Sequence, residues 1–498
     1  MMVVALTTGL LELLSPTQIQ GSPPEFVTGL TQDSRLAQPG CLFVMRSGFK
    51  TSGFEYVNDA AARGAALLLT AEPLPASLPL PALRVKDIAP ALTIAAHYVY
   101  GYPSQKLDLI GITGTNGKTS SVHFIRSIFE TAGAECAMLS TVGYWDGVRL
   151  LNAPLTTPSI DRICELLAQA AVQGCSKAVM EVSSHALDQG RVNRLRYSVA
   201  GFTNLSQDHL DYHRTMEAYF EAKARLFSRL PLDGVAVVNI TQSWGAKLAR
   251  STWGNLVTFG QRGSGADLTV ENLEHTVRGA RYRLVWQGES FDVATRLIGL
   301  YQGENICLAA AVGLAQGLDM DSVKRGIENL QTVPGRMEAV DVGQPFAVFI
   351  DYSHTPDALD RALASLRPLA ANRIIALYGC GGDRDRAKRP IMGAIGVKHA
   401  DLVYITSDNP RTEDPAVICA EIYSGVPEAE RGRVKVMVDR REATFAAAAE
   451  ARLGDVFILS GKGSEPYVEV NGVRTPYDDR VVAAEALRAA GYSKSGEV

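Results

Sequence analysis

The stretch T-G-T-N-G-K-T at 113–119 has the residues that a phosphate-binding loop requires. An apolar run leads into it, and apolar residues at helical spacing follow it over 120–133. In a strand–turn–helix unit of this kind, backbone N–H groups and the positive end of the helix dipole face an anion. Lys118 can then reach the β- and γ-phosphates of a nucleotide, and the Thr119 hydroxyl can coordinate Mg²⁺. The loop is shorter than the strict G-x-x-x-x-G-K-[ST] pattern, whose first glycine would fall at Ile112.

Two more apolar runs end in side chains that can bind metal. The run at 176–183 contains Glu181 near its end, and the run at 197–205 is followed by His209. Ligands of open α/β sheets lie at the carboxyl ends of the strands, so both side chains are expected near the phosphate site. One oxygen and one nitrogen ligand could hold a divalent metal on ATP. Lys223 lies in an amphipathic helix, where a solvated lysine is the ordinary interpretation.

The pattern of elements predicts an α/β protein with three domains, as the length of 498 residues also suggests. Residues 1–104 form a small α/β unit, and residues 105–332 repeat strand and helix around a parallel sheet. Residues 333–498 form a doubly wound, Rossmann-like sheet. From the residues alone, Ser34 and Arg35 are interpreted as a turn with a solvated arginine.

Composition excludes several classes of protein. The net charge of −4 gives no reason to expect nucleic acid or an anionic membrane as a partner. The seven cysteines are scattered and none forms a C-x-x-C pair, which disfavours a zinc site or a disulfide framework. The first residues lack a basic region, and no run of 18 apolar residues occurs. A cytoplasmic enzyme is therefore expected.

A series of motifs resembles one known family. In order along the chain, these motifs are T-G-T-N-G-K-T (113–119), L-T-T-P (155–158), M-E-V-S-S-H-A-L (180–187), F-T-N-L-S-Q-D-H-L-D-Y-H (202–213), E-A-K-A-R-L-F (221–227), P-G-R-M-E (334–338), D-Y-S-H-T-P-D-A-L (351–359), G-C-G-G-D-R-D (379–385) and S-D-N-P-R-T-E-D-P (407–415). Together they resemble the Mur ligases of peptidoglycan synthesis, and among these the members that add the third residue of the stem peptide. The resemblance runs from about residue 31 to residue 482. The first motif is shared with folylpolyglutamate synthetases, whereas D-N-P-R resembles the signature of members that use meso-diaminopimelate.

The resemblance implies a reaction and a division of labour. The reaction would be ATP-dependent joining of meso-2,6-diaminopimelate to the D-glutamate γ-carboxylate of UDP-N-acetylmuramoyl-L-alanyl-D-glutamate, through an acyl phosphate. ATP and Mg²⁺ would be required, the other partners would be small-molecule substrates, and the enzyme would be a monomer. Residues 1–104 would bind the uridine end, 105–332 would form a P-loop ATPase-like domain, and 333–498 would bind the amino acid.

The family's roles carry over to the matching positions of this sequence. The catalytic positions would be Lys118, Glu181, His209 and Lys223. The nucleotide would contact Gly114, Thr115, Asn116, Gly117, Lys118, Thr119, Ser120, Asn305, Arg336 and Asp351. The UDP-muramoyl dipeptide would contact Ser34, Arg35, Thr156, Thr157, Ser183, Gln189 and Arg191. The diaminopimelate pocket would contain Arg384, Asp408, Asn409, Arg411, Gly461 and Glu465. The metal would be held by Thr119, Glu181, His209 and Lys223, the last after carbamylation.

Three alternatives stay open at this point: a lysine-adding version of the same ligase, a folylpolyglutamate-type ligase, and a non-catalytic nucleotide-gated binding subunit. Arg411 favours diaminopimelate, because with lysine bound its guanidinium would lack a carboxylate partner, at a cost of about 1–3 kcal/mol. Two positions depart from the family pattern. Ser464 replaces the usual histidine of a late motif, and Cys41 stands where an acidic residue is usual.

Overall fold

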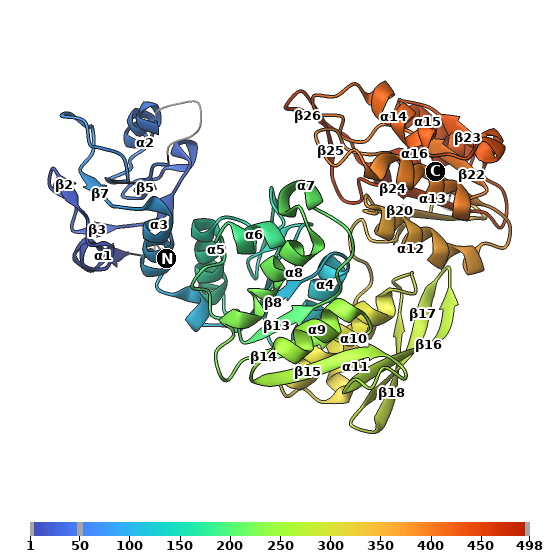
Figure 1. Cartoon of the computed structure of the whole chain (residues 1–498), viewed down its shortest axis with the longest axis horizontal. Coiled ribbons are helices and arrows are strands. Elements are labelled where there is room, and N and C mark those ends of the chain that lie inside the picture. The colour runs from blue at the N-terminus through green and yellow to red at the C-terminus, as the bar shows by residue number, and fades with distance from the viewer. Residues whose placement is uncertain (1–3, 47–52, 494–498) are drawn as a thin grey trace. The chain divides into compact units, whose positions relative to one another are not determined.

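The computed structural model describes residues 4–46 and 53–493 (Figure 1). They divide into two compact units made of separate stretches of chain. The first unit contains the described parts of Met1–Thr113, with Gly133–Ala200 and Ala222–Ala236, and the second contains Gly114–Ala132, Gly201–Glu221 and the described part of Val237–Val498. The chain passes between the units after Thr113, after Ala132, and within β13 (Val199–Phe202), α8 (Met216–Ala224) and β14 (Val235–Asn239).

The N-terminal part of the first unit is a small α/β arrangement. Its main sheet has the order β2-β7-β6-β5-β4, with β2 antiparallel to β7 and the other neighbours parallel. These strands are β2 (Gln18–Gln20), β4 (Leu30–Thr31), β5 (Leu42–Val44), β6 (Leu67–Thr70) and β7 (Ala82–Arg84). The flanking elements are β1 (Ala5–Leu6), β3 (Phe26–Val27), α1 (Thr7–Leu14), α2 (Val57–Ala62) and α3 (Ile88–Val99). Phe43, Val57 and Leu68 pack into one hydrophobic core.

The rest of the first unit contains strands in the order β11-β10-β9-β12-β8. They are β8 (Asp108–Thr113), β9 (Cys136–Leu139), β10 (Tyr144–Trp145), β11 (Leu150–Leu151) and β12 (Lys177–Glu181). Strands β9, β12 and β8 are parallel, and nearly all of their residues are buried, as their continuous apolar runs predict. The helices are α5 (Ile160–Val172) and α6 (Ser184–Asp188).

The second unit begins at Gly114, in the glycine-rich loop, and continues into the helix that follows this loop. Its helices outside the C-terminal region are α4 (Lys118–Thr131), α7 (Leu210–His213), α9 (Ser243–Ser251), α10 (Gln302–Ala315) and α11 (Met320–Asn329). Four strands follow one another in the segment 255–295, namely β15 (Asn255–Gln261), β16 (Leu268–Thr276), β17 (Gly279–Trp286) and β18 (Glu289–Thr295). Helix α4 packs on α10 and α11. A Cβ atom at Gly326 would lie 2.3 Å from Ile128 Cα, so glycine permits this close approach.

The C-terminal region of the second unit has a sheet in the order β19-β20-β24-β21-β22-β23. The strands are β19 (Glu338–Ala339), β20 (Ala347–Asp351), β21 (Ile374–Tyr378), β22 (Leu402–Ile405), β23 (Val434–Val436) and β24 (Val456–Ser460). All neighbours are parallel except β19 and β20. The helices are α12 (Pro356–Leu366), α13 (Lys388–His399), α14 (Pro415–Ser424), α15 (Arg440–Glu450) and α16 (Asp479–Ala489), and a hairpin is formed by β25 (Tyr467–Val470) and β26 (Val473–Pro476).

Both faces of this sheet are covered by helices, which confirms the doubly wound prediction. Ile374 and Ala376 of β21 pack in one core with α12, α13 and α14, whereas Ile375 and Leu377 pack in another with α15 and α16. The alternation follows from the period of two in a strand. The carboxyl ends of the parallel strands therefore lead into loops at one edge of the sheet, where the predicted amino-acid pocket lies.

Candidate active site

Two glycines shape the glycine-rich loop between β8 and α4. The neighbouring atoms leave no room for a Cβ atom at either position. Gly114 has a φ of +145°, and a Cβ atom there would lie 1.8 Å from the Thr203 hydroxyl oxygen. Gly117 has a φ of +87°, and a Cβ atom there would lie 2.2 Å from Asn305 Oδ1. Glycine adopts these backbone angles at little cost and leaves the space free. The loop can therefore lie directly against its neighbours.

The segment after β13 holds the loop through hydrogen bonds. The Asn116 carbonyl accepts from Thr203 Oγ1 at 2.7 Å and from Asn204 Nδ2 at 3.2 Å. The Asn116 N–H donates to Asn204 Oδ1 at 3.0 Å, and the Thr115 N–H donates to the Asn204 carbonyl at 2.9 Å. Thr115 Oγ1 accepts from the Ser206 N–H at 3.1 Å. The folded chain thus fixes the conformation of the loop.

Positive groups gather where α4 begins. Lys118 turns back over the loop, and its Nζ donates to the carbonyls of Gly114 at 2.9 Å and Thr115 at 2.7 Å. Thr119 Oγ1 accepts from Arg336 Nη2 at 2.9 Å. An ammonium and a guanidinium therefore lie at a helix N-terminus, which itself favours negative charge. This arrangement can bind a phosphate group.

Arg336 and Asp351, two predicted nucleotide contacts, belong to one cluster. The guanidinium of Arg336 lies 4.4 Å from the centre of the Tyr352 ring, a cation–π contact. The buried Asp351 carboxylate accepts from the N–H groups of Met337 at 2.8 Å and Ser353 at 2.9 Å. Burial raises the pKa of Asp351, and the bonds from Ser353 and the charge of Arg336 offset this only in part. The cluster holds Arg336 between an aromatic ring and the start of α4.

Asp357 is a contact of the loop that sequence reasoning missed. Its Oδ2 accepts from Asn116 Nδ2 at 2.7 Å and from Ser206 Oγ at 3.1 Å. Asp357 lies in the first turn of α12 and inside the D-Y-S-H-T-P-D-A-L motif, and that position was the available signal. Asn305, also predicted, is buried in α10 and donates to Gln302 Oε1 at 2.9 Å. The predicted Ser120 is buried in α4.

His209 follows β13 in a left-handed conformation with a φ of +54°. Its Nε2 lies 3.4 Å from Asp208 Oδ2, and 42% of its side chain is exposed. Burial would raise the pKa of Asp208, but the charges of His209, His354 and Lys388 lower it. Burial, helped by Lys388, lowers the pKa of His354 to about 4 against the opposing charge of Asp208. Asp208 is therefore an ionised carboxylate beside His209.

Two further predicted metal ligands, Glu181 and Lys223, belong to the first unit. Glu181 ends β12, and its Oε1 accepts from Ser140 Oγ at 2.7 Å and the Thr141 N–H at 2.8 Å. Lys223 is 1% exposed. Within the described ranges, His, Cys, Asp and Glu side chains form no group of three or more suited to a metal ion. The roles of Glu181 and Lys223 stay predictions.

Of the residues predicted to contact the UDP-muramoyl dipeptide, Thr157, Ser183, Gln189 and Arg191 are brought together by hydrogen bonds, whereas none of these bonds reaches Ser34 or Arg35. The Thr157 hydroxyl accepts from the Ser183 N–H at 3.0 Å, and the Thr157 carbonyl accepts from Arg191 Nη1 at 2.8 Å. Arg191 Nη2 also donates to Gln189 Oε1 at 2.6 Å. Thr156 precedes Thr157 in the chain. The two ends of α6 and the segment before α5 thus form one polar cluster.

A pocket of about 1070 Å³ lies beside the short 3-10 helix Ser34–Leu36. Charged side chains line it, namely Asp33, Arg35, Asp146, Arg149, Asp161, Arg162 and Glu165. Arg35 Nη2 donates to Asp33 Oδ2 at 2.6 Å, and this pairing lowers the pKa of Asp33. Cys41, the departure from the family pattern, is buried and also lines the pocket. The pocket is large enough for a nucleotide-sized ligand.

Four residues of the predicted diaminopimelate pocket lie together in the second unit. Asn409 Nδ2 donates to Glu465 Oε2 at 2.8 Å. Gly461 has a φ of +116°, and a Cβ atom there would lie 2.6 Å from Asp408 Oδ2. Burial and the charge of Asp408 raise the pKa of Glu465. The ends of β22 and β24 therefore place these side chains at one site.

Lys462, in the same G-K-G-S-E stretch, was missed by sequence reasoning. It is fully buried, and its Nζ donates to Asn409 Oδ1 at 3.2 Å. The same Nζ lies 3.9 Å from carboxylate oxygens of both Asp408 and Glu465. Burial lowers the pKa of Lys462. Because Asn409 Oδ1 faces the lysine, its Nδ2 is directed to Glu465.

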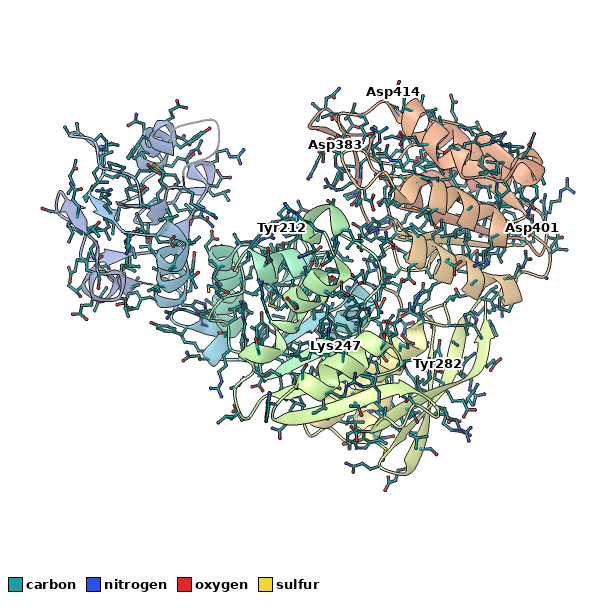
Figure 2. All side chains as sticks on the ribbon, in the orientation of Figure 1. Tyr212, Lys247, Tyr282, Asp383, Asp401 and Asp414 are labelled. Carbon is teal, nitrogen blue, oxygen red and sulfur yellow. The ribbon has the colours of Figure 1, made fainter. Side chains whose placement is uncertain are left out.

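The two predicted arginines of this pocket lie on adjoining loops. Arg411 has a φ of +52°, and its Nη1 donates to the Gly382 carbonyl at 2.7 Å. Arg384 Nη1 donates to the Asp383 carbonyl at 2.9 Å. Asp383 lies in the loop after β21 and is labelled in Figure 2. Both guanidinium groups are suited to gripping a carboxylate through paired hydrogen bonds.

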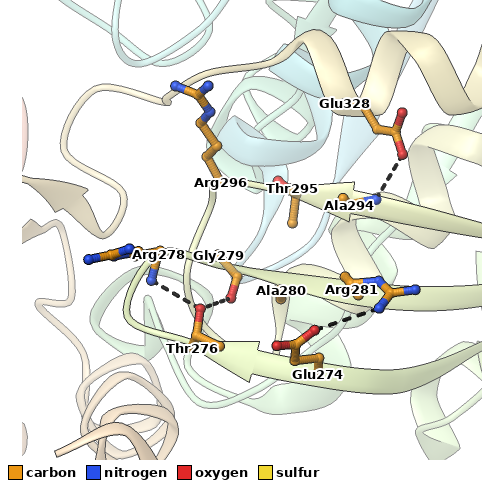
Figure 3. Close-up of a pocket in the computed structure, with 10 residues that line it drawn as sticks. All are labelled: Glu274, Thr276, Arg278, Gly279, Ala280, Arg281, Ala294, Thr295, Arg296 and Glu328. Atoms are coloured by element: carbon orange, nitrogen blue, oxygen red, sulfur yellow. Dashed lines mark hydrogen bonds and ion pairs between the residues drawn. The ribbon is translucent and has the colours of Figure 1, made fainter.

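A smaller pocket of about 480 Å³ belongs to β16, β17 and β18 (Figure 3). Arg278, Arg281 and Arg296 line it together with Glu274 and Glu328. Arg281 pairs loosely with Glu274 at 3.8 Å, and Glu328 Oε1 accepts from the Ala294 N–H at 3.1 Å (Figure 3). The residues that line this pocket include none of the predicted site residues.

Comparison with known proteins identifies the family. The model described as "Mur ligase middle domain" matches residues 112–313, and that described as "Mur ligase, glutamate ligase domain" matches residues 335–463. A protein from Solibacter usitatus named UDP-N-acetylmuramoyl-L-alanyl-D-glutamate--2,6-diaminopimelate ligase is 41% identical over 471 residues, covering 94% of this chain and 95% of that protein. A protein of the same name from Aquifex aeolicus is 38% identical over 465 residues, covering 93% of this chain and 94% of that protein. A solved structure of a ligase of that name aligns with a TM-score of 0.66 at 32% identity, covering 99% of this chain and all of that one.

The chain belongs to the Mur ligase family. The predicted family, the α/β fold class and the amide-forming ligase activity are thereby confirmed. None of the described helices has both the length and the hydropathy needed to cross a membrane. The predicted domain boundaries and the roles of individual site residues stay predictions.

Proposed function

We propose that this chain joins meso-2,6-diaminopimelate to the D-glutamate γ-carboxylate of UDP-N-acetylmuramoyl-L-alanyl-D-glutamate and consumes ATP. The product would be a precursor of peptidoglycan, and the enzyme would act as a monomer in the cytoplasm. One observation carries the proposal: the chain is 38–41% identical, over 93–94% of its length, to proteins named for this reaction. The glycine-rich loop and the arginine-bearing loops of the second unit support it.

The triphosphate of ATP is proposed to bind at the loop that precedes α4. Lys118 would exchange its bonds to two loop carbonyls for bonds to phosphate oxygens. Its ammonium would then neutralise the charge that moves with the γ-phosphoryl group. Arg336, held beside Thr119, places a second positive charge at the same helix terminus.

Mg²⁺ is proposed to accompany ATP. The Thr119 hydroxyl and the Glu181 carboxylate are hard oxygen donors of the kind that Mg²⁺ prefers, and Glu181 is held in one orientation by Ser140 and Thr141. His209 and Lys223 are the other proposed ligands, Lys223 after carbamylation has given it a carboxylate. When bound, the cation would neutralise phosphate charge.

The proposed chemistry has two steps. A γ-carboxylate oxygen of the D-glutamate attacks the γ-phosphorus, and the bond from that phosphorus to the bridging oxygen breaks, which gives an acyl phosphate and ADP. The amine of diaminopimelate then attacks the acyl carbon, phosphate leaves with the bonding pair, and the nitrogen loses a proton. The main contribution of the protein is to hold the reacting atoms in line.

Arg411 is proposed to select the amino acid. Diaminopimelate has a second carboxylate that lysine lacks, and a guanidinium can grip it through paired hydrogen bonds. With lysine bound, the guanidinium would have no carboxylate partner, so a site of this kind can discriminate by about 10⁴. Arg384, Asn409 and Glu465 are proposed to contact the rest of the amino acid.

The UDP-muramoyl dipeptide is proposed to bind in the first unit. Its diphosphate is negatively charged, and Arg35, Arg149 and Arg162 line the large pocket there. The polar cluster around Thr157 and Arg191 is proposed to contact the muramoyl dipeptide.

A phosphate-release assay with the UDP-dipeptide and ATP tests this function, with diaminopimelate, lysine and ornithine offered in parallel. We expect release with diaminopimelate and little with the other two. Equal release with lysine would indicate the lysine-adding version, and release with glutamate and a folate would indicate a folylpolyglutamate-type ligase. No release with any complete set would indicate a non-catalytic binding subunit.

A further inference from the structure

A fully buried arginine lies behind the two loops that carry Arg384 and Arg411. Arg389, near the start of α13, is 0% exposed, whereas its partners Glu413 and Glu421 are 21% and 30% exposed. Its Nη1 donates to Glu413 Oε2 at 2.9 Å and Glu421 Oε2 at 2.6 Å, and its Nη2 donates to Glu413 Oε1 at 2.8 Å. A buried charge of this kind persists because paired carboxylates compensate it.

The pair formed by Arg389 and Glu413 joins the loop after β21 to the loop after β22. Glu413 Oε1 also accepts from the Asp383 N–H at 2.6 Å, and Arg389 Nη2 also donates to the Gly381 carbonyl at 3.3 Å. Asp383 Oδ1 in turn accepts from Thr412 Oγ1 at 2.7 Å. Each loop is therefore bonded to the other through charged or polar side chains.

Between these bonds the two loops touch through their backbones. The Gly382 N–H donates to the Asn409 carbonyl at 2.9 Å, and a Cβ atom at Gly382 would lie 1.9 Å from the Pro410 carbonyl oxygen. Arg411 Nη1 donates to the Gly382 carbonyl at 2.7 Å, so the direction of its guanidinium depends on where the first loop lies. A small displacement of that loop would therefore turn the guanidinium.

We infer that Arg389 and Glu413 are positioning residues for recognition of the amino-acid substrate. They hold the two loops in register so that Arg384 and Arg411 present their guanidinium groups to its carboxylates. The inference rests on the proposed function, and neither Arg389 nor Glu413 is proposed to touch the substrate. Binding of a carboxylate by paired bonds depends on geometry to within a fraction of an ångström, which a shifted loop cannot provide.

Glu421 provides a matched contrast to Glu413. Its carboxylate pairs with the same Arg389 and with Arg386, and it lies on α14. None of the hydrogen bonds found among the described residues joins the Glu421 carboxylate to Gly381, Gly382 or Asp383. Replacement of either glutamate by glutamine removes one charge next to Arg389. Only Glu413 also accepts from the backbone of the loop, at the Asp383 N–H, whereas Glu421 reaches the end of that loop only through the exposed side chain of Arg386.

The test is steady-state kinetics of Glu413→Gln and Glu421→Gln, with each substrate varied in turn. We expect Glu413→Gln to raise KM for diaminopimelate by about tenfold and to increase the relative use of lysine, with KM for ATP changed by less than about twofold. Glu421→Gln should change every KM by less than about threefold. A purely structural role would not separate one substrate from the others.

The inference fails if the two variants behave alike or if Glu413→Gln raises all three KM values together. If circular dichroism shows that Glu413→Gln does not fold, Thr412→Val carries the test. Thr412 is exposed, and the change removes only the hydroxyl that bonds to Asp383. An increase of about two- to fivefold in KM for diaminopimelate supports the inference, and an unchanged KM overturns it. Failure of the proposed function would be seen in the wild-type enzyme itself, which would then not use diaminopimelate. The two failures can therefore be distinguished, because the inference is tested only by comparing variants.

Discussion

The phosphate loop at 113–119 and the paired loops at 379–385 and 408–414 are both expected to bind anionic groups, yet they are built differently. The phosphate loop is shaped by glycines and held mainly by bonds to its own backbone from the segment after β13. The paired loops depend on charged side chains that come from α13, from the strand ends and from the loops themselves. The residues that identify the phosphate loop lie in one short stretch of sequence. The residues that hold the paired loops are distributed over the chain.

Because the two kinds of loop are held by different bonds, we expect them to respond to different substitutions. A neutral backbone bond contributes about 1 kcal/mol, whereas bonds that involve charged groups contribute about 1.5–3 kcal/mol each. The phosphate loop should therefore tolerate the loss of single polar side chains around it but not an added Cβ atom. The paired loops should respond to changes of charge at residues that do not touch the substrate.

The largest effect is expected from Lys118→Ala. The change removes the ammonium that is proposed to neutralise the moving phosphoryl group, so kcat should fall by about 10³ in a phosphate-release assay. Lys86→Ala removes an exposed lysine elsewhere and should leave kcat within about twofold of wild type. If Lys118→Ala kept more than a tenth of the activity, the phosphate-loop assignment would be wrong.

The next largest effect is expected from Arg411→Ala. Loss of the guanidinium should lower kcat/KM for diaminopimelate by about 10², while KM for ATP changes by less than about twofold. Arg411→Lys keeps the charge but loses the paired donors, so it should fall between the wild type and the alanine variant. Equal losses for diaminopimelate and ATP would contradict the proposed role.

A smaller effect, on stability, is expected from Gly117→Ala and is best measured against Gly133→Ala. Both glycines have similar positive φ values, +87° and +85°, but a Cβ atom clashes with Asn305 at the first and meets nothing within 4 Å at the second. The shared backbone strain should cost about 1 kcal/mol, and the clash should add about 1–2 kcal/mol at Gly117. Thermal denaturation should therefore give the lower midpoint for Gly117→Ala. Equal midpoints would show that the neighbours of the loop yield easily.

The same contrast explains what could be predicted from the sequence. The strand–turn–helix unit at the phosphate loop and the strands of the C-terminal sheet were predicted because apolar runs and glycines report local structure. Lys462, Asp357 and Arg389 were not predicted to matter, because each acts through partners distant in sequence. From the sequence alone, Arg389 would be interpreted as an ordinary arginine near the end of a helix.

The family motifs pointed to Arg384 and Arg411 without revealing what holds them. No periodicity links residue 389 to residues 413 and 421, since their pairing depends on how α13, α14 and the strand ends pack. The polar cluster at Thr157 and Arg191 is similar, because its members were identified by resemblance and their mutual bonds appear only in the fold. Long-range side-chain networks are the part of a site that local sequence patterns do not contain.

The smallest effect is expected when the pH is lowered. Acid should change the stability that Glu413 gives to the paired loops, but not the stability lost through a steric clash at the phosphate loop. Hydrogen bonds from Arg389 and from the Asp383 N–H lower the pKa of Glu413 to about 2 from its ordinary 4.5. A carboxylate with a lowered pKa stabilises the fold fully above pH 4.5, and this contribution is lost as the pH falls toward 2. Because Glu413 is 21% exposed, we expect a contribution of about 1–2 kcal/mol rather than the full value of the shift. Thermal midpoints of the wild type and Glu413→Gln should therefore approach each other as the pH falls from 4.5 toward 2, whereas the deficit of Gly117→Ala should stay constant because a steric clash does not titrate. A Glu413→Gln deficit that is independent of pH would mean that the charge of Glu413 does not hold the paired loops.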